Sequence, residues 1–141
     1  MSNLYQTKKV FDDALKALYG DSAVNNPAYN GTNTVIDGIQ IWTTFDNIDD
    51  SNFEDSKHIS VSMPYKIEFI RGNRDATKEE ERKEQASIDF EDIIKKIFET
   101  MLSENIRNVS YNTGTIEFIV QNDFQSYGNV VFNINHQIRV M

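Results

Sequence analysis

Residues 58–71 read HISVSMPYKIEFIR, and this stretch decides the fold because apolar and polar side chains alternate along it. A period of two residues indicates a strand with one buried face. The apolar positions of that face are Ile59, Val61, Met63, Tyr65, Ile67 and Phe69. Pro64 has no N–H to donate to a neighbouring strand, so we expect this part of the strand to lie at a sheet edge or a bulge.

Downstream of this strand, the sequence predicts an amphipathic helix over residues 88–103. Its apolar side chains recur every three or four residues and form a broad stripe that we expect to anchor the core. The stripe consists of Phe90, Ile93, Ile94, Ile97, Phe98, Met101 and Leu102. Asp89 is placed to cap the helix. Residues 72–87 contain almost no apolar side chain, so we expect a solvated segment, either an irregular loop or an exposed extension of this helix.

The N-terminal part of the chain predicts another helix. Residues 4–19 show apolar side chains at helical spacing with lysines and aspartates between them. Gly20 follows the last periodic residue, where a left-handed residue often ends a helix. Residues 21–34 are rich in turn formers and are expected to form an irregular loop.

A hairpin is predicted between this loop and the central strand. Residues 35–36 and 39–45 are apolar enough to be strands, and the Asp37-Gly38 pair between them suits a tight two-residue turn. Residues 46–57 are polar and acidic, and we expect them to form a second irregular loop.

The last third of the chain again favours strands. Residues 109–111 predict a short strand before an Asn-Thr-Gly turn, and residues 115–120 and 130–141 predict longer ones. The sequence therefore predicts a single domain over residues 1–141. Its class is α+β, an antiparallel (mixed) β-sheet packed with two main α-helices in the order α-β-β-β-α-β-β. Phe118 and Ile134 are expected to join its core.

Composition limits the classes of function. The 141 residues carry a formal net charge of -8, which disfavours nonspecific binding to DNA, RNA or anionic lipid. The chain has no cysteine, so disulfides, thiolate catalysis and cysteine-ligated metals are excluded. The N-terminal residues lack the apolar core of a secretory signal, and no stretch approaches the ~20 apolar residues of a membrane span. We therefore expect an intracellular protein without a membrane partner.

The sequence offers little that resembles a catalytic or metal site. His58 and His136 are the two histidines, and neither has an orienting carboxylate at a recognisable spacing. The acidic run over residues 46–55 lacks the spacing of a calcium-binding loop. Phosphate-binding glycine motifs and the serine nucleophile motif are also absent from the sequence. We expect no catalytic residues, no metal and no cofactor, and hence no enzymatic activity.

Aromatic residues in polar surroundings are the strongest candidates for a functional surface. Trp42, Phe45, Phe124 and Tyr127 fall on predicted loops or on the second face of a predicted strand. Aromatic side chains at such positions often contact another chain. The prediction is a subunit interface at these four residues. The alternative is that the chain's own helices cover both faces of the sheet.

The order of the predicted elements resembles the tail terminator proteins of long-tailed phages and the related neck and tail-completion proteins. The residues that carry the resemblance are LYQTKKVFDDALKALYG (4–20), ISVSMPYKIEF (59–69), FEDIIKKIFETML (90–102) and VVFNINHQIRV (130–140). The family has no catalytic motif, so no site residue is carried over. The loops over 21–34 and 72–87 are longer than in a compact member.

The resemblance implies a structural virion subunit that forms a homomeric ring, with six copies as the expected number. Such a ring would cap the tail tube and join it to the neck or connector proteins, with DNA passing through its centre without specific binding. The implied location is the virion tail, and the host cytoplasm during assembly. A different class stays open, an acidic inhibitor or immunity-type protein that binds a basic partner as a monomer.

Overall fold

The sheet of this protein is built around one long strand, β4 (His58–Gly72), which pairs along its whole length with β6 (Gln125–Arg139). In the computed structural model, which describes residues 4–20, 23–24, 37–45, 50–53, 57–117 and 124–139, these are two of six strands. The remaining elements are α1 (Leu4–Tyr19), β1 (Ala23–Val24), β2 (Gly38–Thr44), β3 (Asp50–Phe53), a 3-10 turn (Ala76–Lys78), α2 (Glu79–Ser103) and β5 (Val109–Glu117).

The strand order is β1-β2-β4-β6-β5, and β3 also pairs with β4. The β1–β2 pairing is parallel and the other four are antiparallel, which makes a mixed sheet dominated by antiparallel strands. Because β6 occupies one edge of β4 throughout, β2 and β3 share the other edge, β2 opposite residues 66–72 and β3 opposite residues 59–62. The α+β class and the order of the main elements are confirmed.

β4 is an interior strand, but the part that contains Pro64 forms a local edge within it among the described residues, and no bulge is present there. Pro64 pairs with Asn133 of β6, and on its other side β4 pairs with β2 only from Lys66 onward and with β3 only up to Ser62. The N–H of Asn135 donates to the carbonyl of Asn108, next to β5 (2.7 Å). Because the direction of the backbone groups alternates along an antiparallel strand, the N–H and C=O of Asn133 also point toward β5 and away from Pro64. Pro64 therefore faces the gap between β2 and β3, where its missing N–H breaks no pairing seen among the described residues.

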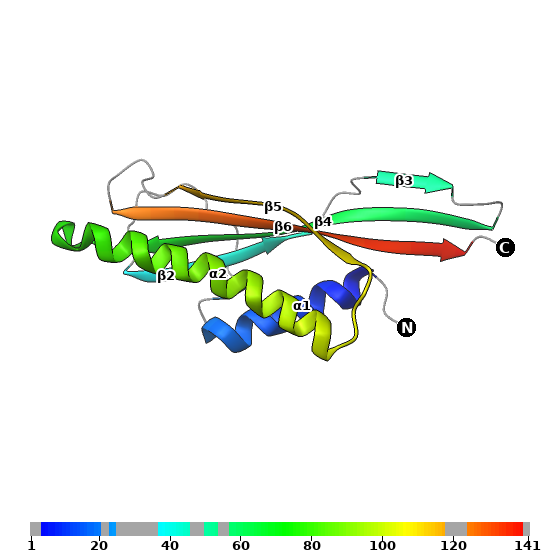
Figure 1. Ribbon diagram of the computed structural model, residues 1–141, viewed down its shortest axis with the longest axis horizontal. Coiled ribbons are helices and arrows are strands. Elements are labelled where there is room, and N and C mark those ends of the chain that lie inside the picture. Colours follow the sequence, from blue (N-terminus) through cyan, green and yellow to red (C-terminus); the bar gives the residue numbers. More distant parts are fainter. Residues whose placement is uncertain are drawn as a thin grey trace.

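Both helices pack on the same face of the sheet, as Figure 1 shows. This is the face predicted from the alternation of β4, because Tyr65, Ile67 and Phe69 are fully buried there. The fully buried apolar residues from the helices and the other strands are Phe11, Leu15, Ile41, Ala86, Ile93, Ile97, Val130, Phe132 and Ile134. The core is thus a single layer of side chains between two helices and the long β4–β6 pair.

Helix α2 begins at Glu79, nine residues before the predicted start, so of the two alternatives for residues 72–87 the helix extension is correct from residue 79 and the irregular loop is not. The segment is held because Arg82 and Ala86 are buried on the same side as Ile93, at helical spacing. Asp89, predicted as the cap, instead lies within the helix and is buried. The helix is instead preceded by the 3-10 turn. Asp75 caps this turn, because its carboxylate accepts a hydrogen bond from the N–H of Thr77 (3.0 Å).

Four further strands differ from the prediction. β1 lies within the expected loop over 21–34, and β3 within that over 46–57. Instead of two strands joined by a turn, β5 is continuous, with a bulge between Tyr111 and Thr113. β6 begins at Gln125 rather than Val130. Residues 35–36, Phe118 and residues 140–141 lie outside the described residues, so the hairpin and the placement of Phe118 remain predictions.

The apolar stripe of α2 is wider than one sheet face can cover. At about 100° per residue, Phe98 points about 140° and Leu102 about 180° away from Ile93. Ile93 and Ile97 are fully buried, whereas Phe98 is 42% and Leu102 83% exposed. Phe98 packs edge-on against Phe132 (5.7 Å between ring centres), so it contacts the core from the side and is not one of its central residues.

We predict that Ile97→Ala lowers the free energy of unfolding by about 2 to 5 kcal/mol, because it leaves a cavity in the core. Leu102→Ala, the matched control on the same helix, should change it by less than about 0.5 kcal/mol. Urea denaturation of both variants measures the difference. Equal losses would show that α2 faces the sheet differently.

Candidate functional site

Trp42 and Tyr127, two of the four predicted interface residues, lie on the sheet face that is opposite the helices. Trp42 pairs with Glu68 across β2 and β4, and Tyr127 pairs with Ile70, the next residue on that face. Trp42 is only 6% exposed and Tyr127 is half-buried. Most of the Trp42 side chain is therefore covered within the single chain.

Tyr127 is tied to the sheet by hydrogen bonds. Its hydroxyl donates to Oε2 of Glu68 (2.6 Å) and accepts from the amide of Asn129 (3.3 Å). Lys66 completes the group at 3.7 Å from the other oxygen of Glu68. Burial, together with the Glu68 carboxylate, raises the pKa of Tyr127 to about 12. Tyr127 therefore stays protonated and acts as a hydrogen-bond donor that holds the Glu68 carboxylate in place.

Phe45 and Phe124 lie elsewhere. Phe45, just after β2, packs on the helix side against Tyr65 with 6.2 Å between ring centres. Phe124 immediately precedes β6, where its carbonyl accepts from the N–H of Asn73 (3.0 Å). The four aromatic residues thus occupy both faces and one end of the sheet, and they do not form one continuous surface.

The histidines are likewise separated. His58 begins β4, and His136 on β6 pairs with Val61. Among the described residues, no three acidic or histidine side chains are close enough to hold a metal ion. The acidic run over residues 46–55 lies outside the described side chains. Neither described helix is both long and apolar enough to cross a membrane.

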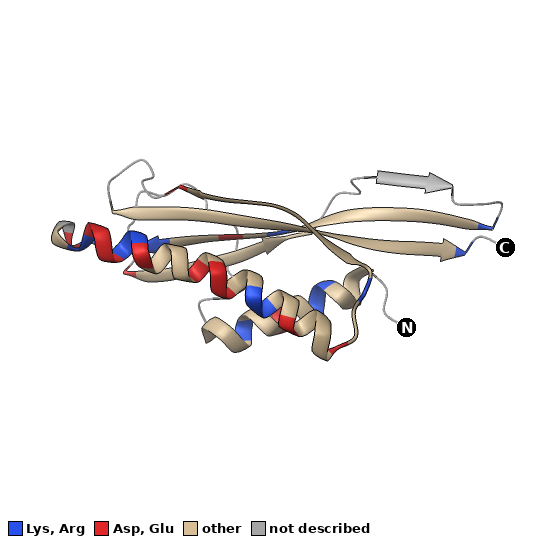
Figure 2. Cartoon of the chain, in the orientation of Figure 1, with Lys and Arg blue, Asp and Glu red and all other residues tan. Residues whose placement is uncertain are grey.

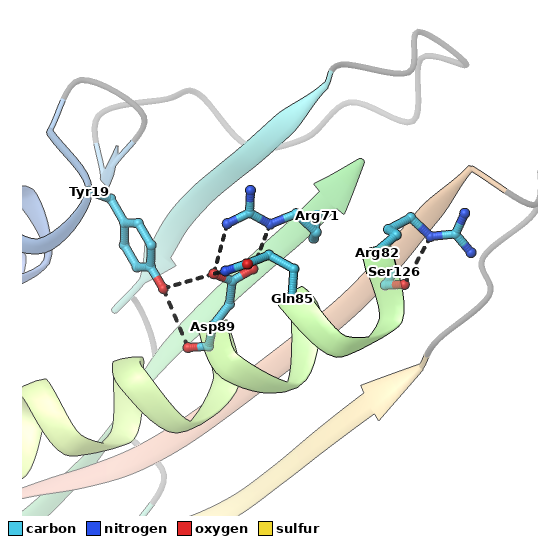
Figure 3. Close-up of polar contacts among 6 residues, drawn as sticks. All are labelled: Tyr19, Arg71, Arg82, Gln85, Asp89 and Ser126. Atoms are coloured by element: carbon cyan, nitrogen blue, oxygen red, sulfur yellow. Dashed lines mark hydrogen bonds and ion pairs between the residues drawn. The ribbon is translucent and has the colours of Figure 1, made fainter. Parts of the chain in front are cut away.

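The most elaborate polar cluster joins both helices to the sheet, as Figure 3 shows. Arg71, near the end of β4, donates two hydrogen bonds to Asp89 of α2 (2.7 and 2.8 Å). The Tyr19 hydroxyl, at the end of α1, and the Gln85 amide also approach the Asp89 carboxylate, at 3.3 and 3.4 Å. The Asp89 side chain is 1% exposed and that of Arg71 19%. Burial and Asp89 raise the pKa of Tyr19, which keeps this donor protonated.

A second buried carboxylate, Asp12, fixes the middle of α1. It accepts hydrogen bonds from Tyr65 of β4 (2.6 Å) and Thr43 of β2 (3.0 Å), and it forms an ion pair with Lys8 (2.6 Å). Burial, reinforced by Asp12, raises the pKa of Tyr65 well above its usual value. Both clusters consist of paired, hydrogen-bonded groups that join elements, which is a structural arrangement.

A shallow cavity of about 190 Å³ opens beside Arg71, between the start of α2 and the start of β2. Its lining includes Arg82, whose Nε donates to Ser126 (3.3 Å) and which is 2% exposed. Asp37 and Glu81 also line it. The volume is below the usual range of small-molecule sites, and the cavity mixes acidic with basic side chains. It therefore offers no evident chemistry.

The clearest candidate for a functional surface is a part of the sheet that we call the arm. It comprises β3, residues 58–63 of β4 and residues 134–139 of β6, and it extends beyond both helices in Figure 1. Its helix-side face continues the apolar alternation of β4 with Ile59, Val61 and Met63. Ile59 and Met63 are half-buried and Ile138, opposite Ile59, is 41% exposed.

A second surface surrounds β5, the last strand of the sheet. Tyr111 on β5 is 46% exposed and, like Phe98, packs against the buried ring of Phe132 at 5.7 Å. Phe98 was expected in the core, and neither of these two surfaces was predicted from the sequence. The signals were present, in the excess width of the α2 stripe and in the length of the β4 alternation.

Comparisons with known proteins do not assign a family. No protein-family model matches the sequence, and no curated protein is significantly similar to it. Function must therefore be inferred from the chain's own residues and geometry.

We predict that Arg71→Met lowers the free energy of unfolding by about 3 to 5 kcal/mol, because it leaves the buried Asp89 carboxylate without its cation. The matched control is Arg74→Met, since Arg74 forms an exposed pair with Asp37 at 3.9 Å, with side chains 68% and 64% exposed. That change should cost at most about 1 kcal/mol. Thermal and urea denaturation measure both; equal effects would contradict the role of the buried pair.

Alkaline pH should destabilise the fold partly through Tyr127. Between pH 10 and about 12 the unfolded chain releases the Tyr127 proton while the folded chain retains it, so the free energy of unfolding falls as pH rises through this window. Below pH 10 both states hold the proton and the contribution is constant. Tyr127→Phe should therefore flatten the decline above pH 10. Urea titrations of parent and variant at pH 8, 10 and 11 test this, and parallel curves would refute it.

Proposed function

We propose that this protein is a non-catalytic structural subunit that assembles with copies of itself into a ring in a phage virion, as a tail terminator or neck protein. The resemblance of its sequence elements to that family supports the proposal, as does the α+β fold with two helices on one sheet face. In this role its partners are further copies, with six expected in the ring, the tail tube protein and the neck or connector proteins. It resides in the virion, and in the host cytoplasm during assembly.

The observation that carries the proposal is the partly exposed apolar face of the arm, where Ile138 is 41% exposed although Val61 is only 6% exposed. Tyr65, Ile67 and Phe69 are fully buried under the helices, whereas the same stripe continues into the arm through Ile59 and Met63, which are half-buried. Apolar area on a strand face is stabilising only when another layer covers it. A neighbouring subunit is a suitable cover, because every copy carries the same arm.

The position of the arm favours a ring. The arm projects from one end of an elongated subunit, so its face would meet a different part of the next copy. Such a head-to-tail contact generates a closed ring when the rotation between subunits closes. The isologous alternative, arm against arm, would end at two copies.

The charge distribution is compatible with a DNA passage. Figure 2 shows acidic and basic residues interspersed along α2, while the described strands carry few charged residues. With a net charge of -8, a ring would repel DNA at long range and so allow it to pass without specific binding.

The alternative, an acidic inhibitor of a basic partner, is favoured by one feature. The first turns of α2 expose carboxylates, with the Glu80 side chain 90% and that of Glu81 70% exposed. An inhibitor of this kind would remain monomeric until its basic target is added, and its binding would weaken steeply with salt.

We predict that Ile138→Glu prevents ring formation while leaving the melting temperature of the monomer nearly unchanged, since Ile138 is already 41% exposed. A charge buried at an interface without a partner is strongly unfavourable. Gln137→Glu is the matched control, because Gln137 is the adjacent exposed residue on the opposite face of β6. Light scattering coupled to size exclusion, and binding to purified tail tubes, report assembly. A parent protein that neither forms rings at high concentration nor binds tail tubes would contradict the proposal.

A further inference from the structure

β5 presents a sheet edge that none of the described strands covers, because it ends the strand order. Natural proteins usually protect such edges with charged side chains or proline. Residues 108–116, NVSYNTGTI, contain neither. The bulge between Tyr111 and Thr113 is the one protective feature within this strand.

The ladder with β6 shows which backbone groups of β5 point outward. The carbonyl of Asn108 accepts from Asn135 of β6, so in an antiparallel ladder Val109 and Tyr111 turn their N–H and C=O groups to the outer edge. The bulge shifts this alternation by one residue, since Thr113 pairs with Val131. Beyond the bulge, the outward-facing residues are Gly114 and Ile116.

We propose that β5 pairs with β5 of a second copy of this chain, antiparallel and about a twofold axis between Asn112 and Thr113. In this register, Val109 lies opposite Ile116 of the second copy, and Tyr111 lies opposite Gly114 of the second copy. All four outward-facing residues of each strand then meet outward-facing residues, so the pairing satisfies both edges at once.

Side chains also suit this register. Val109, Tyr111, Gly114 and Ile116 point to the helix side of the sheet, because their partners on β6 include the buried Ile134, Phe132 and Val130. The pairing therefore places apolar side chains beside one another on the face where Phe98 is exposed. The space beside Gly114 is filled by Phe90 and by the Tyr111 hydroxyl of the same chain, so in this register the Tyr111 side chains of the two copies lie on either side of the twofold axis. Ser110, Thr113 and Thr115 share the other face.

Charge complementarity favours a second copy as the occupant. Arg107, two residues before β5, and Glu117, the last residue of β5, are both exposed, and neither has an ion-pair partner among the described residues, although Arg107 donates to Asn105 (3.1 Å). The proposed register brings Arg107 of each copy within one residue of Glu117 of the other, at both ends. Between these ends the edge is uncharged, so two chains of net charge -8 meet where their repulsion is weakest.

This contact goes beyond the proposed ring. An isologous contact closes after two copies, whereas the arm contact is head-to-tail. The two surfaces also use different strand edges and faces, so each can be removed without the other.

The test is a charge exchange followed by mass measurement. In the Ile138→Glu background, which lacks the arm contact, light scattering over a concentration series should show a dimer, and adding Arg107→Glu or Glu117→Arg alone should raise its dissociation constant about tenfold or more. The double variant R107E/E117R should restore the dimer. Lys95→Glu, on the exposed side of α2, changes the net charge as Arg107→Glu does and should have no effect.

Amide hydrogen exchange tests the backbone part of the proposal. The N–H groups of Tyr111, Gly114 and Ile116 should gain protection as the concentration rises, while those of Ser110 and Thr115, bonded to β6, should be protected at every concentration. Each of three results would overturn the proposal. These are a parent or an Ile138→Glu background that stays monomeric, a double variant that does not regain the dimer, and hydrogen-exchange protection of the outward-facing amides that does not change with protein concentration.

Discussion

The buried ion pair between Arg71 and Asp89 is the contact on which the arrangement of the helices depends. It joins β4 to α2, and Tyr19 adds the end of α1 to the same carboxylate. A carboxylate that is 1% exposed is tolerated only with such partners, so sliding α2 along the sheet would leave a buried charge unpaired. The pair therefore fixes the position of α2, which in turn places Arg82, two turns earlier, beside Ser126. Asp12 fixes the middle of α1 in the same way.

The sequence predicts the elements whose side chains alternate or recur regularly. β4 is predicted within a residue because its buried face is apolar from Ile59 to Phe69. The start of α2 could not be predicted from apolar spacing, since its first buried side chains are an arginine and an alanine. Arg82 is buried through contacts from a distant strand, which no local pattern shows. Likewise, Asp89 has the sequence position of a cap and is needed inside the helix as the partner of Arg71.

The candidate surfaces, like the start of α2, could be predicted only as far as local sequence patterns allow. An aromatic residue in a polar context predicts exposure only if no distant segment covers it, and Trp42 is covered. Conversely, Phe98 has the spacing of a core residue, but it lies beyond the edge of the layer that α2 can bury.

The need for glycine at particular positions was equally unpredictable from the sequence. A Cβ at Gly114 would lie 2.7 Å from Cζ of Phe90, so β5 can approach α2 only without a side chain there. Such contacts depend on sheet order, which local sequence does not specify.

A mismatch in length between helices and strands explains why the arm exists. A strand of 15 residues extends about 50 Å, whereas the 16 residues of α1 reach about 24 Å and the 25 residues of α2 about 37 Å. The buried Arg71–Asp89 pair anchors α2 near the C-terminal end of β4. The helix therefore covers residues 65–72 of β4 and extends past that end of the sheet, away from the arm. No shift of α2 toward the arm is available without breaking the pair. The same interaction that orders the core therefore leaves the start of β4 and the end of β6 beyond the reach of the two described helices, so that Ile59 and Met63 are only half-buried and Ile138 is 41% exposed.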